Sequence, residues 1–347
     1  MLQYFLGSYI VTIAGIIAAY FWGEHVHSGA GLSSIFIVLV LAVLETSLSF
    51  DNAVVNAMKL EKMSDVWRHR FLTWGIAIAV FGMRFLFPVL VVAIFAKLDM
   101  LTVTKIALTD SHKYAQYLHA THAPIVTFGG MFLIMLFLNY FFNHEKDVHW
   151  IKPIEAPLSH LDHIRGIEII ISMLMLLGLQ SFIPVESKVA VIISGMAGII
   201  TFLAIDGVAH FLEKHEEMRN AKCAADSVKC AGLISFIYLE LIDASFSLDG
   251  VLGAFALSND VLIITIGLAI GAMFVRSLTI MLVEKKTLAQ FLYLEHGAHW
   301  AIGALAVIML VSTVKEVPEV VTGLIGLFFI VAALISSIIY NKKRFSK

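Results

Sequence analysis

Long apolar runs separated by short polar stretches dominate the pattern along this chain. Several runs exceed the roughly 20 residues that a helix needs to cross the hydrocarbon core of a bilayer. Membrane β-strands would instead give shorter segments of alternating polarity. We therefore predict an all-α fold, a polytopic bundle of about ten transmembrane helices. The ten spans are expected at residues 4–22, 33–57, 71–95, 123–142, 167–183, 188–212, 232–257, 260–283, 298–313 and 319–340.

Composition supports this class of protein. Hydrophobic residues make up 59% of the 347 residues and charged residues 14%, far from the balance of a soluble domain. The formal net charge is −2 and no long block of like charge occurs, so we expect no nucleic-acid partner. The two cysteines, Cys223 and Cys230, lie too far apart and are too few for a zinc signature. The first run lacks a basic start and a cleavage site, so we expect a retained helix.

The distribution of basic residues predicts the orientation. If both termini lie on one side, the loops and tail on that side hold 17 of the 24 Lys and Arg residues, and the other side holds 5. The remaining two, Arg84 and Arg276, lie inside predicted spans. Because cytoplasmic loops are enriched in Lys and Arg, we expect both termini in the cytoplasm and an even number of spans.

One short motif occurs twice. The stretches Glu45-Thr-Ser-Leu-Ser-Phe-Asp51 and Asp243-Ala-Ser-Phe-Ser-Leu-Asp249 share the pattern acidic-x-Ser-x-Ser-x-Asp. Both lie in apolar runs, where inserting each carboxylate costs roughly 2.5–3.5 kcal/mol. A run that begins with Gly and ends with Arg follows each copy, at residues 75–84 and 267–276. Two matched acidic motifs in such positions indicate a function.

The two copies lie in the second and seventh predicted spans, so an odd separation makes them cross the membrane in opposite senses. Inverted repeats around a shared midplane site are a recurrent design of transporters. We predict two inverted-topology repeats of three helices each. The expected parts are an N-terminal helix with an outward loop (1–32), the first repeat (33–142), a cytoplasmic loop with two intervening helices (143–231), the second repeat (232–313), and a C-terminal helix with a basic cytoplasmic tail (314–347).

All polar side chains of the two motifs offer oxygen, which suits hard cations such as Mg²⁺, Ca²⁺ or Mn²⁺ better than Zn²⁺ or Cu⁺. The predicted metal ligands are Glu45, Ser49, Asp51, Asn52, Asp243, Ser247 and Asp249. The four acids carry a charge of −4, which Arg84 and Arg276 would reduce to −2 if both point inward. One divalent cation then neutralises the site, and buried charges need such balance.

Helical geometry separates the acids of the first motif. A straight helix would carry on one face Glu45, Ser49, Asn52 and Asn56. Asp51 would diverge from Glu45 by about a third of a turn. A break directly after Asp51 would bring the two together, since Asn52 and its counterpart Gly250 readily adopt the left-handed conformation. The alternative is that Gly250 and Gly253 only allow close helix packing.

The two motifs resemble the TerC family of bacterial integral membrane proteins. The resemblance rests on Leu44-Glu45 with Ser49-Phe50-Asp51-Asn52-Ala53 and on residues 241–251, and it extends over about residues 33–313. It implies a place in the bacterial cytoplasmic (inner) membrane and a link to manganese export or tellurium resistance. The functional acids of that family fall on Glu45, Asp51, Asp243 and Asp249. The long histidine-containing loops, 96–122 and 143–165, depart from typical members.

Other ionisable residues are candidates for supporting roles. Glu240, one turn before Asp243, and Asp206 are candidate proton relays, because intramembrane acids often serve in this way. For Asp206, as for Glu168, the alternative is a carboxylate at the membrane interface. Histidines in the loops either capture metal or sense pH, or are only solvated. These histidines are His112, His119, His122, His144, His149, His160 and His163, with His296 and His299 at the start of the ninth span.

We expect no enzyme, because the chain has no Gly-rich phosphate loop, no GxSxG and no HExxH. The oxygen-rich motifs predict binding of a divalent cation, and the resemblance implies its export, with manganese as the first candidate, through the acidic site. The lipid bilayer, this cation and coupled protons are the expected partners, and no permanently bound cofactor is expected. The alternatives are transport of another cation or small solute, or a membrane scaffold that aids metal loading or stress resistance, including tellurite. A scaffold should tolerate Asp51→Asn and Asp249→Asn.

Overall fold

The computed structural model describes residues 2–26, 28–61, 63, 65–143, 148–159, 164, 166–218, 236–237, 239–241, 243, 254, 257–258, 260–285, 291–315 and 317–345. The described residues form helices and turns without a strand, which confirms the predicted all-α class for this part of the chain. They divide into two compact units. The first unit holds residues 1–57, 68–122 and 240–285, and the second holds 58–67, 123–239 and 286–347.

Six described helices are long and apolar enough to cross a membrane: Gln3–Val26, His112–Phe142, Val185–Val208, Val261–Glu284, Leu294–Ser312 and Leu324–Lys342. A bent pair, Gly31–Ser47 with Asn52–Glu61, would be a seventh. The chain is therefore a multi-pass membrane protein. Ten spans remain a prediction, because the apolar helix Ile167–Phe182 is short and most of 232–257 lies outside the described residues.

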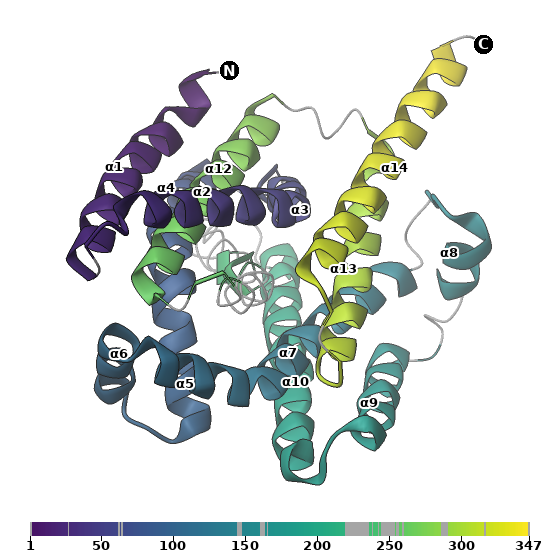
Figure 1. Cartoon of the computed structure of the whole chain (residues 1–347). Coiled ribbons are helices and arrows are strands. Elements are labelled where there is room, and N and C mark those ends of the chain that lie inside the picture. Colours follow the sequence, from purple (N-terminus) through teal and green to yellow (C-terminus); the bar gives the residue numbers. More distant parts are fainter. Residues whose placement is uncertain are drawn as a thin grey trace. The chain divides into compact units, whose positions relative to one another are not determined.

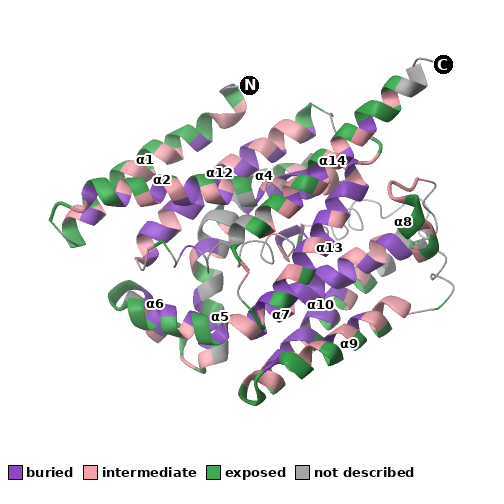
Figure 2. Cartoon of the chain, turned by 45° about the vertical axis from the view of Figure 1, so that its right-hand side comes forward, coloured by how far each residue is buried: buried purple, intermediate pink, exposed green. Residues whose placement is uncertain are grey.

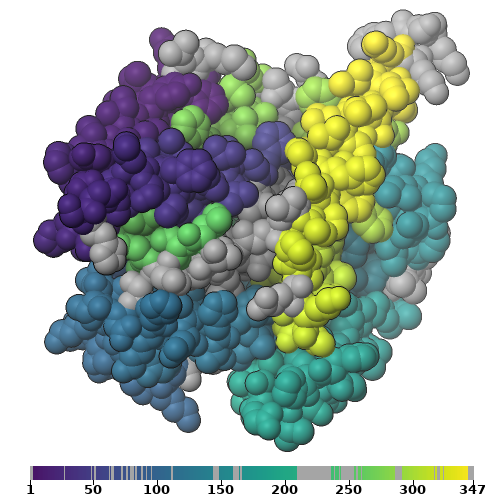
Figure 3. Space-filling view, viewed as in Figure 1, coloured from purple at the N-terminus to yellow at the C-terminus, as the bar shows by residue number. Residues whose placement is uncertain are grey.

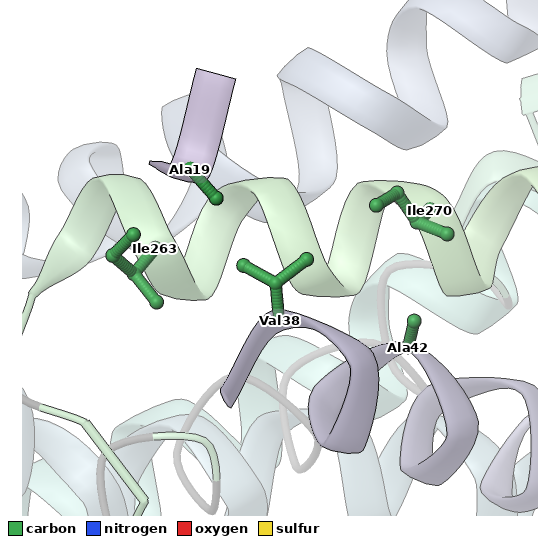
Figure 4. Packing of buried hydrophobic residues seen from close by; sticks show 5 residues of the cluster. All are labelled: Ala19, Val38, Ala42, Ile263 and Ile270. Atoms are coloured by element: carbon green, nitrogen blue, oxygen red, sulfur yellow. The ribbon is translucent and has the colours of Figure 1, made fainter. Parts of the chain in front are cut away.

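Three helices form the core of the first unit: α1 (Leu2–Val26), α2 (Gly31–Leu48) and α12 (Val261–Glu284). They lie side by side in Figure 1. Figure 4 shows their shared apolar cluster, which contains Ala19, Val38, Ala42, Ile263 and Ile270. The apolar window of α12 is 72% buried and that of α1 only 11%, so α12 is central and α1 presents its apolar surface outward, as a lipid-facing helix does (Figure 2).

Polar contacts fix the ends and register of these helices. The hydroxyl of Ser8 on α1 donates to the carbonyl oxygen of Met273 at 2.8 Å and lies 2.8 Å from the hydroxyl of Ser277. Asp260 caps α12 by accepting the backbone N–H groups of the first turn, and its second oxygen accepts from the indole of Trp22 at 2.8 Å. These contacts hold α1 against α12 at both ends.

The third predicted span is an interrupted helix. It consists of α4 (Asp65–Ala77), the π-helix η1 (Ile78–Leu86) and α5 (Phe87–Ala96). π-Helical segments are rare in proteins, and those that occur are often found at functional sites. Here the segment carries Arg84.

The chain then turns at Lys97, whose φ of 54° ends α5 in the left-handed conformation. Asp99 caps α6 (Met100–Thr109), and the hydrogen bonds from Thr102 hold the pKa of Asp99 below its usual range. Helix α7 follows at Ser111–Phe142 and continues into the second unit.

The second unit contains the remaining helices: α8 (Lys152–Ser159), α9 (Ile167–Leu179), η3 (Gln180–Phe182), α10 (Val185–Met218), α13 (Leu294–Ser312) and α14 (Glu319–Phe345). Helices α9 and α10 pack together, as the short turn at Pro184 predicts. A Cβ at Gly195 of α10 would lie 2.5 Å from Leu176 of α9, so this glycine permits their close approach. The apolar window of α14 is only 22% buried, and this helix is prominent on the face shown in Figure 3.

Candidate functional site

Glu45 lies near the end of α2 and is buried, with 2% of its surface exposed. Its carboxylate accepts hydrogen bonds from the guanidinium of Arg84 and from the hydroxyl of Ser49, the latter at 2.8 Å. A Cβ at Gly271 of α12 would lie 2.5 Å from the Cβ of Glu45. The glycine thus provides the space in which this acid and its arginine form a buried ion pair.

The motif helix is bent at Ser49, where α2 ends at Leu48 and α3 (Phe50–Glu61) begins. The two segments make an angle of 52°. A break directly after Asp51 was one of two possibilities, and the structure has none there, because α3 runs continuously through Asp51 and Asn52. Asn52 lies inside α3, and Lys97 is the one non-glycine residue with positive φ in the described part of the chain.

The hydrogen bonding explains why no left-handed residue is needed. The N–H of Ser49 still donates to the carbonyl of Glu45, and the N–H of Ala53 donates to that of Ser49. At Ser49 the backbone only relaxes to φ −95° and ψ 18°. The predicted shared face survives the bend, since its four members are all buried: Glu45, Ser49, Asn52 and Asn56.

Beyond the bend, a small cavity lies within the first unit. Its volume of about 20 Å³ is enough for one water-sized occupant. The lining residues come from α3, α4, η1, α12 and the start of the second motif, and they are Asn52, Asn56, Phe71, Arg84, Asp243, Ala272, Val275, Arg276 and Thr279. Residues of both motif regions therefore meet at one small cavity with several polar lining residues.

The two asparagines contribute differently to this cavity. The amide nitrogen of Asn52 donates to Oδ1 of Asp243 at 2.5 Å, which links the first motif to the first acid of the second. Oδ1 of Asn56 is buried and accepts no hydrogen bond from the described residues. Buried acceptors normally have a partner, so this oxygen is placed to contact a bound cation or water.

Arg276 and Glu240 form the other polar part of the site. The guanidinium carbon of Arg276 lies 4.3 Å from the ring centroid of Phe71, a cation–π geometry. A Cβ at Gly75 would collide with Nη2 of Arg276 and lie 2.9 Å from Oε1 of Glu240. Arg276 and Glu240 are both 8% exposed. Gly75, singled out by its spacing to Arg84, thus lies against Arg276, the arginine that follows the second motif.

The structure brings together seven of the predicted site residues: Glu45, Ser49, Asn52, Glu240, Asp243, Arg84 and Arg276. Ser247 and Asp249 lie outside the described residues, and the side chain of Asp51 is not described. Within the described ranges, no group of three His, Cys, Asp or Glu residues is arranged to hold a metal ion. Asp243 is the described acid that lines the cavity, whereas Glu45 is paired with Arg84.

Four lining residues were not predicted, and two of them, Thr279 and Phe71, bring polar or aromatic groups to the cavity. Thr279 follows Arg276 by three positions on α12, and its hydroxyl contacts the carbonyl oxygens of Val275 at 3.0 Å and Ala53 at 3.4 Å. The spacing between Thr279 and Arg276 could have identified Thr279 from the sequence, because positions three apart share a helix face. Phe71 could not be identified as a site residue from the sequence, since aromatic residues are frequent in any apolar helix.

Several other predicted candidates lie in the second unit. Asp206 of α10 accepts a hydrogen bond from Asn139 of α7 at 3.3 Å. Glu155 of α8, which was not predicted, is 1% exposed and accepts from the indole of Trp300 at 2.9 Å. Two histidines approach its carboxylate, His296 at 3.6 Å and His149 at 4.0 Å. His144, His160 and His163 lie outside the described residues.

This fold and cavity define an all-helical, multi-pass membrane protein with a buried polar site. The chain belongs to the DUF475 family, which is described as protein of unknown function and matches residues 50–344. That range includes the second motif and the first from Phe50 onward. A search of curated proteins and a search of solved structures gave no match.

Proposed function

We propose that this protein exports a divalent metal cation, most simply manganese, across the bacterial cytoplasmic membrane. The observation that carries the proposal is the small cavity at which Asn52 and Asn56 of the first motif helix meet Asp243 of the second motif. Asn56 offers it a buried oxygen with no hydrogen-bond donor among the described residues. Carboxylate and amide oxygens are the ligands of hard divalent cations.

The buried arginines support the charge balance of such a site. Arg84 and Arg276 both line the cavity. Together with the four acids of the motifs, these two arginines give a net charge of −2. A divalent cation would bring this set to zero. Glu240 adds a fifth carboxyl group to the first unit and is a candidate carrier of coupled protons. Asp206 of the second unit is another candidate.

The division into two units supports the proposed inverted repeats. The first unit takes predicted spans 33–57 and 71–95 from one repeat, and most of 232–257 with 260–283 from the other. The second unit takes the third span of each repeat, 123–142 and 298–313. Equivalent spans therefore share a unit, an arrangement suited to repeats that exchange roles in alternating access. In this proposal both termini lie in the cytoplasm.

The size of the cavity is compatible with a cation as the occupant. A volume of about 20 Å³ is enough for one ion or one water molecule. Manganese is preferred to other divalent cations only because of the resemblance to the TerC family. A scaffold without transport makes no use of the cavity and would not depend on its acids.

The test is manganese content and growth of a manganese-sensitive bacterial strain. The strain carries wild type, Asp51→Asn, Asp249→Asn, the exposed control Glu186→Gln or an empty vector, with equal membrane levels verified. We expect wild type and Glu186→Gln to lower cell manganese and restore growth, and both aspartate variants to fail. If wild type changes no divalent metal, the proposal is wrong. If the aspartate variants work as well as wild type, transport does not use these acids.

A further inference from the structure

Two arginines line the cavity, and their bonding differs. Arg84 is paired with Glu45, which is also held by Ser49. Arg276 is equally buried, yet its Nε and Nη2 atoms make no hydrogen bond with any described residue. Buried guanidinium groups are normally paired with carboxylates, because an unpaired buried charge is costly. The unused donors of Arg276 are therefore the feature of this site that needs an explanation.

The surroundings of Arg276 offer it two alternative positions. On one side is the ring of Phe71, 4.3 Å from the guanidinium carbon, which stabilises a cation without neutralising it. On the other side are carboxyl groups: Asp243 lines the same cavity, and Oε1 of Glu240 reaches the same surface of Gly75. That oxygen also has no hydrogen-bond partner among the described residues. A short rotation of the side chain would exchange the ring for the carboxylates, and the missing Cβ at Gly75 leaves room for it.

We infer that Arg276 is a tethered counter-cation that alternates with the transported metal ion at Asp243 and Glu240. The inference rests on the proposed function. When no metal is bound, the guanidinium pairs with these carboxylates. When a divalent cation enters the cavity, repulsion between like charges holds the guanidinium on Phe71. Arg84 does not alternate, because Glu45 and Ser49 fix its position.

This exchange has a consequence for the transport cycle. Carboxylates without a cation are costly in an interior that excludes water, so the metal-free protein would change its orientation slowly. The tethered guanidinium stabilises the metal-free site and lets it return. Net export needs this return step, whereas exchange of one bound manganese ion for another does not.

The first test measures Mn²⁺ affinity of the purified full-length protein by competition with a metal-indicator dye. We expect Arg276→Gln to bind Mn²⁺ at least threefold more tightly, because the competing cation is gone. Phe71→Leu should bind at least threefold more weakly, because the guanidinium loses its second position. Arg276→Lys should also bind more weakly, since an ammonium lacks the planar face that stacks on Phe71. These two variants keep the test decisive if Arg276→Gln does not fold.

The second test uses proteoliposomes. Arg276→Gln should lose net Mn²⁺ transport at least tenfold but keep exchange of labelled for unlabelled Mn²⁺. A purely structural arginine would lower affinity in every variant and reduce net transport and exchange together, and this result would overturn the inference alone. If the wild type binds no Mn²⁺, Mg²⁺ or Ca²⁺, the proposed function fails and the inference falls with it.

Discussion

Asn56 is the residue whose chemistry most directly separates a binding site from ordinary packing. Its buried Oδ1 has no donor among the described residues, which makes it a cost to stability unless a ligand contacts it. Asn56→Leu should therefore weaken Mn²⁺ binding at least tenfold while leaving the unfolding free energy unchanged or higher by about 1 kcal/mol. Dye competition and thermal unfolding in detergent measure the two effects. A variant that is both weaker in binding and less stable would show that Asn56 serves packing.

The buried ion pair of Glu45 and Arg84 predicts that a single variant loses more stability than the double variant. Glu45→Gln leaves a buried guanidinium without its counter-charge and should destabilise the protein by about 3 kcal/mol. The double variant Glu45→Gln, Arg84→Gln should recover much of this loss, because no charge remains unpaired. Chemical or thermal unfolding of the two single variants, the double variant and wild type forms a double-mutant cycle. Additive losses would mean that the two side chains are stabilised independently.

At the scale of helices, close approach of α12 to α2 depends on Gly271. A Cβ there would lie 2.5 Å from the Cβ of Glu45 and 2.9 Å from the backbone oxygen of Ala42. Gly271→Ala should cost about 1–3 kcal/mol of stability and reduce metal binding, because one helix must shift. The control is Gly178→Ala in α9, where nothing lies within 4 Å and alanine favours the helix. Equal stability of the two variants would contradict the packing described.

A buried carboxylate of α8 contacts tryptophans outside this helix. Glu155 accepts from the indole of Trp300 and from the backbone N–H of Trp150, at 2.9 and 2.8 Å. Glu155→Ala leaves both donors unsatisfied, at a cost of about 1–3 kcal/mol, and should release α8 from α13. Limited proteolysis should then cut faster between residues 143 and 166. Unchanged cleavage would show that other contacts hold this helix.

The sequence predicts helix identity and the motif face well, and fails where tertiary contacts decide. The buried face of Glu45, Ser49, Asn52 and Asn56 follows from helical spacing alone. The bend between α2 and α3 at Ser49 does not follow from that spacing, because the same helical periodicity continues on both sides of it. The π-helix around Arg84 and the ring of Phe71 beneath Arg276 depend on helices distant in sequence.

For the whole molecule, the inverted arrangement depends on whether α9 with η3 crosses the membrane. The segment Ile167–Phe182 is the shorter type of apolar helix, and at 1.5 Å per residue it spans about 24 Å, less than the ~30 Å of a hydrocarbon core. If it did not cross, α10 would carry the chain to the opposite side. The two motifs would then lie parallel, and a shared inverted-repeat site would be excluded. Local thinning of the bilayer accommodates such a deficit at modest cost.

The two native cysteines, Cys223 and Cys230, decide this question, because they follow α10 in the loop expected in the cytoplasm. A membrane-impermeant maleimide should label them in inverted vesicles but not in intact cells. The control is Lys113→Cys in a background without native cysteines, at the exposed start of α7 on the side expected outside, which should label in intact cells. If both sites label from outside, α9 does not span and the repeats are parallel. Labelling from opposite sides would support an odd number of spans between the two sites, as the inverted repeats require.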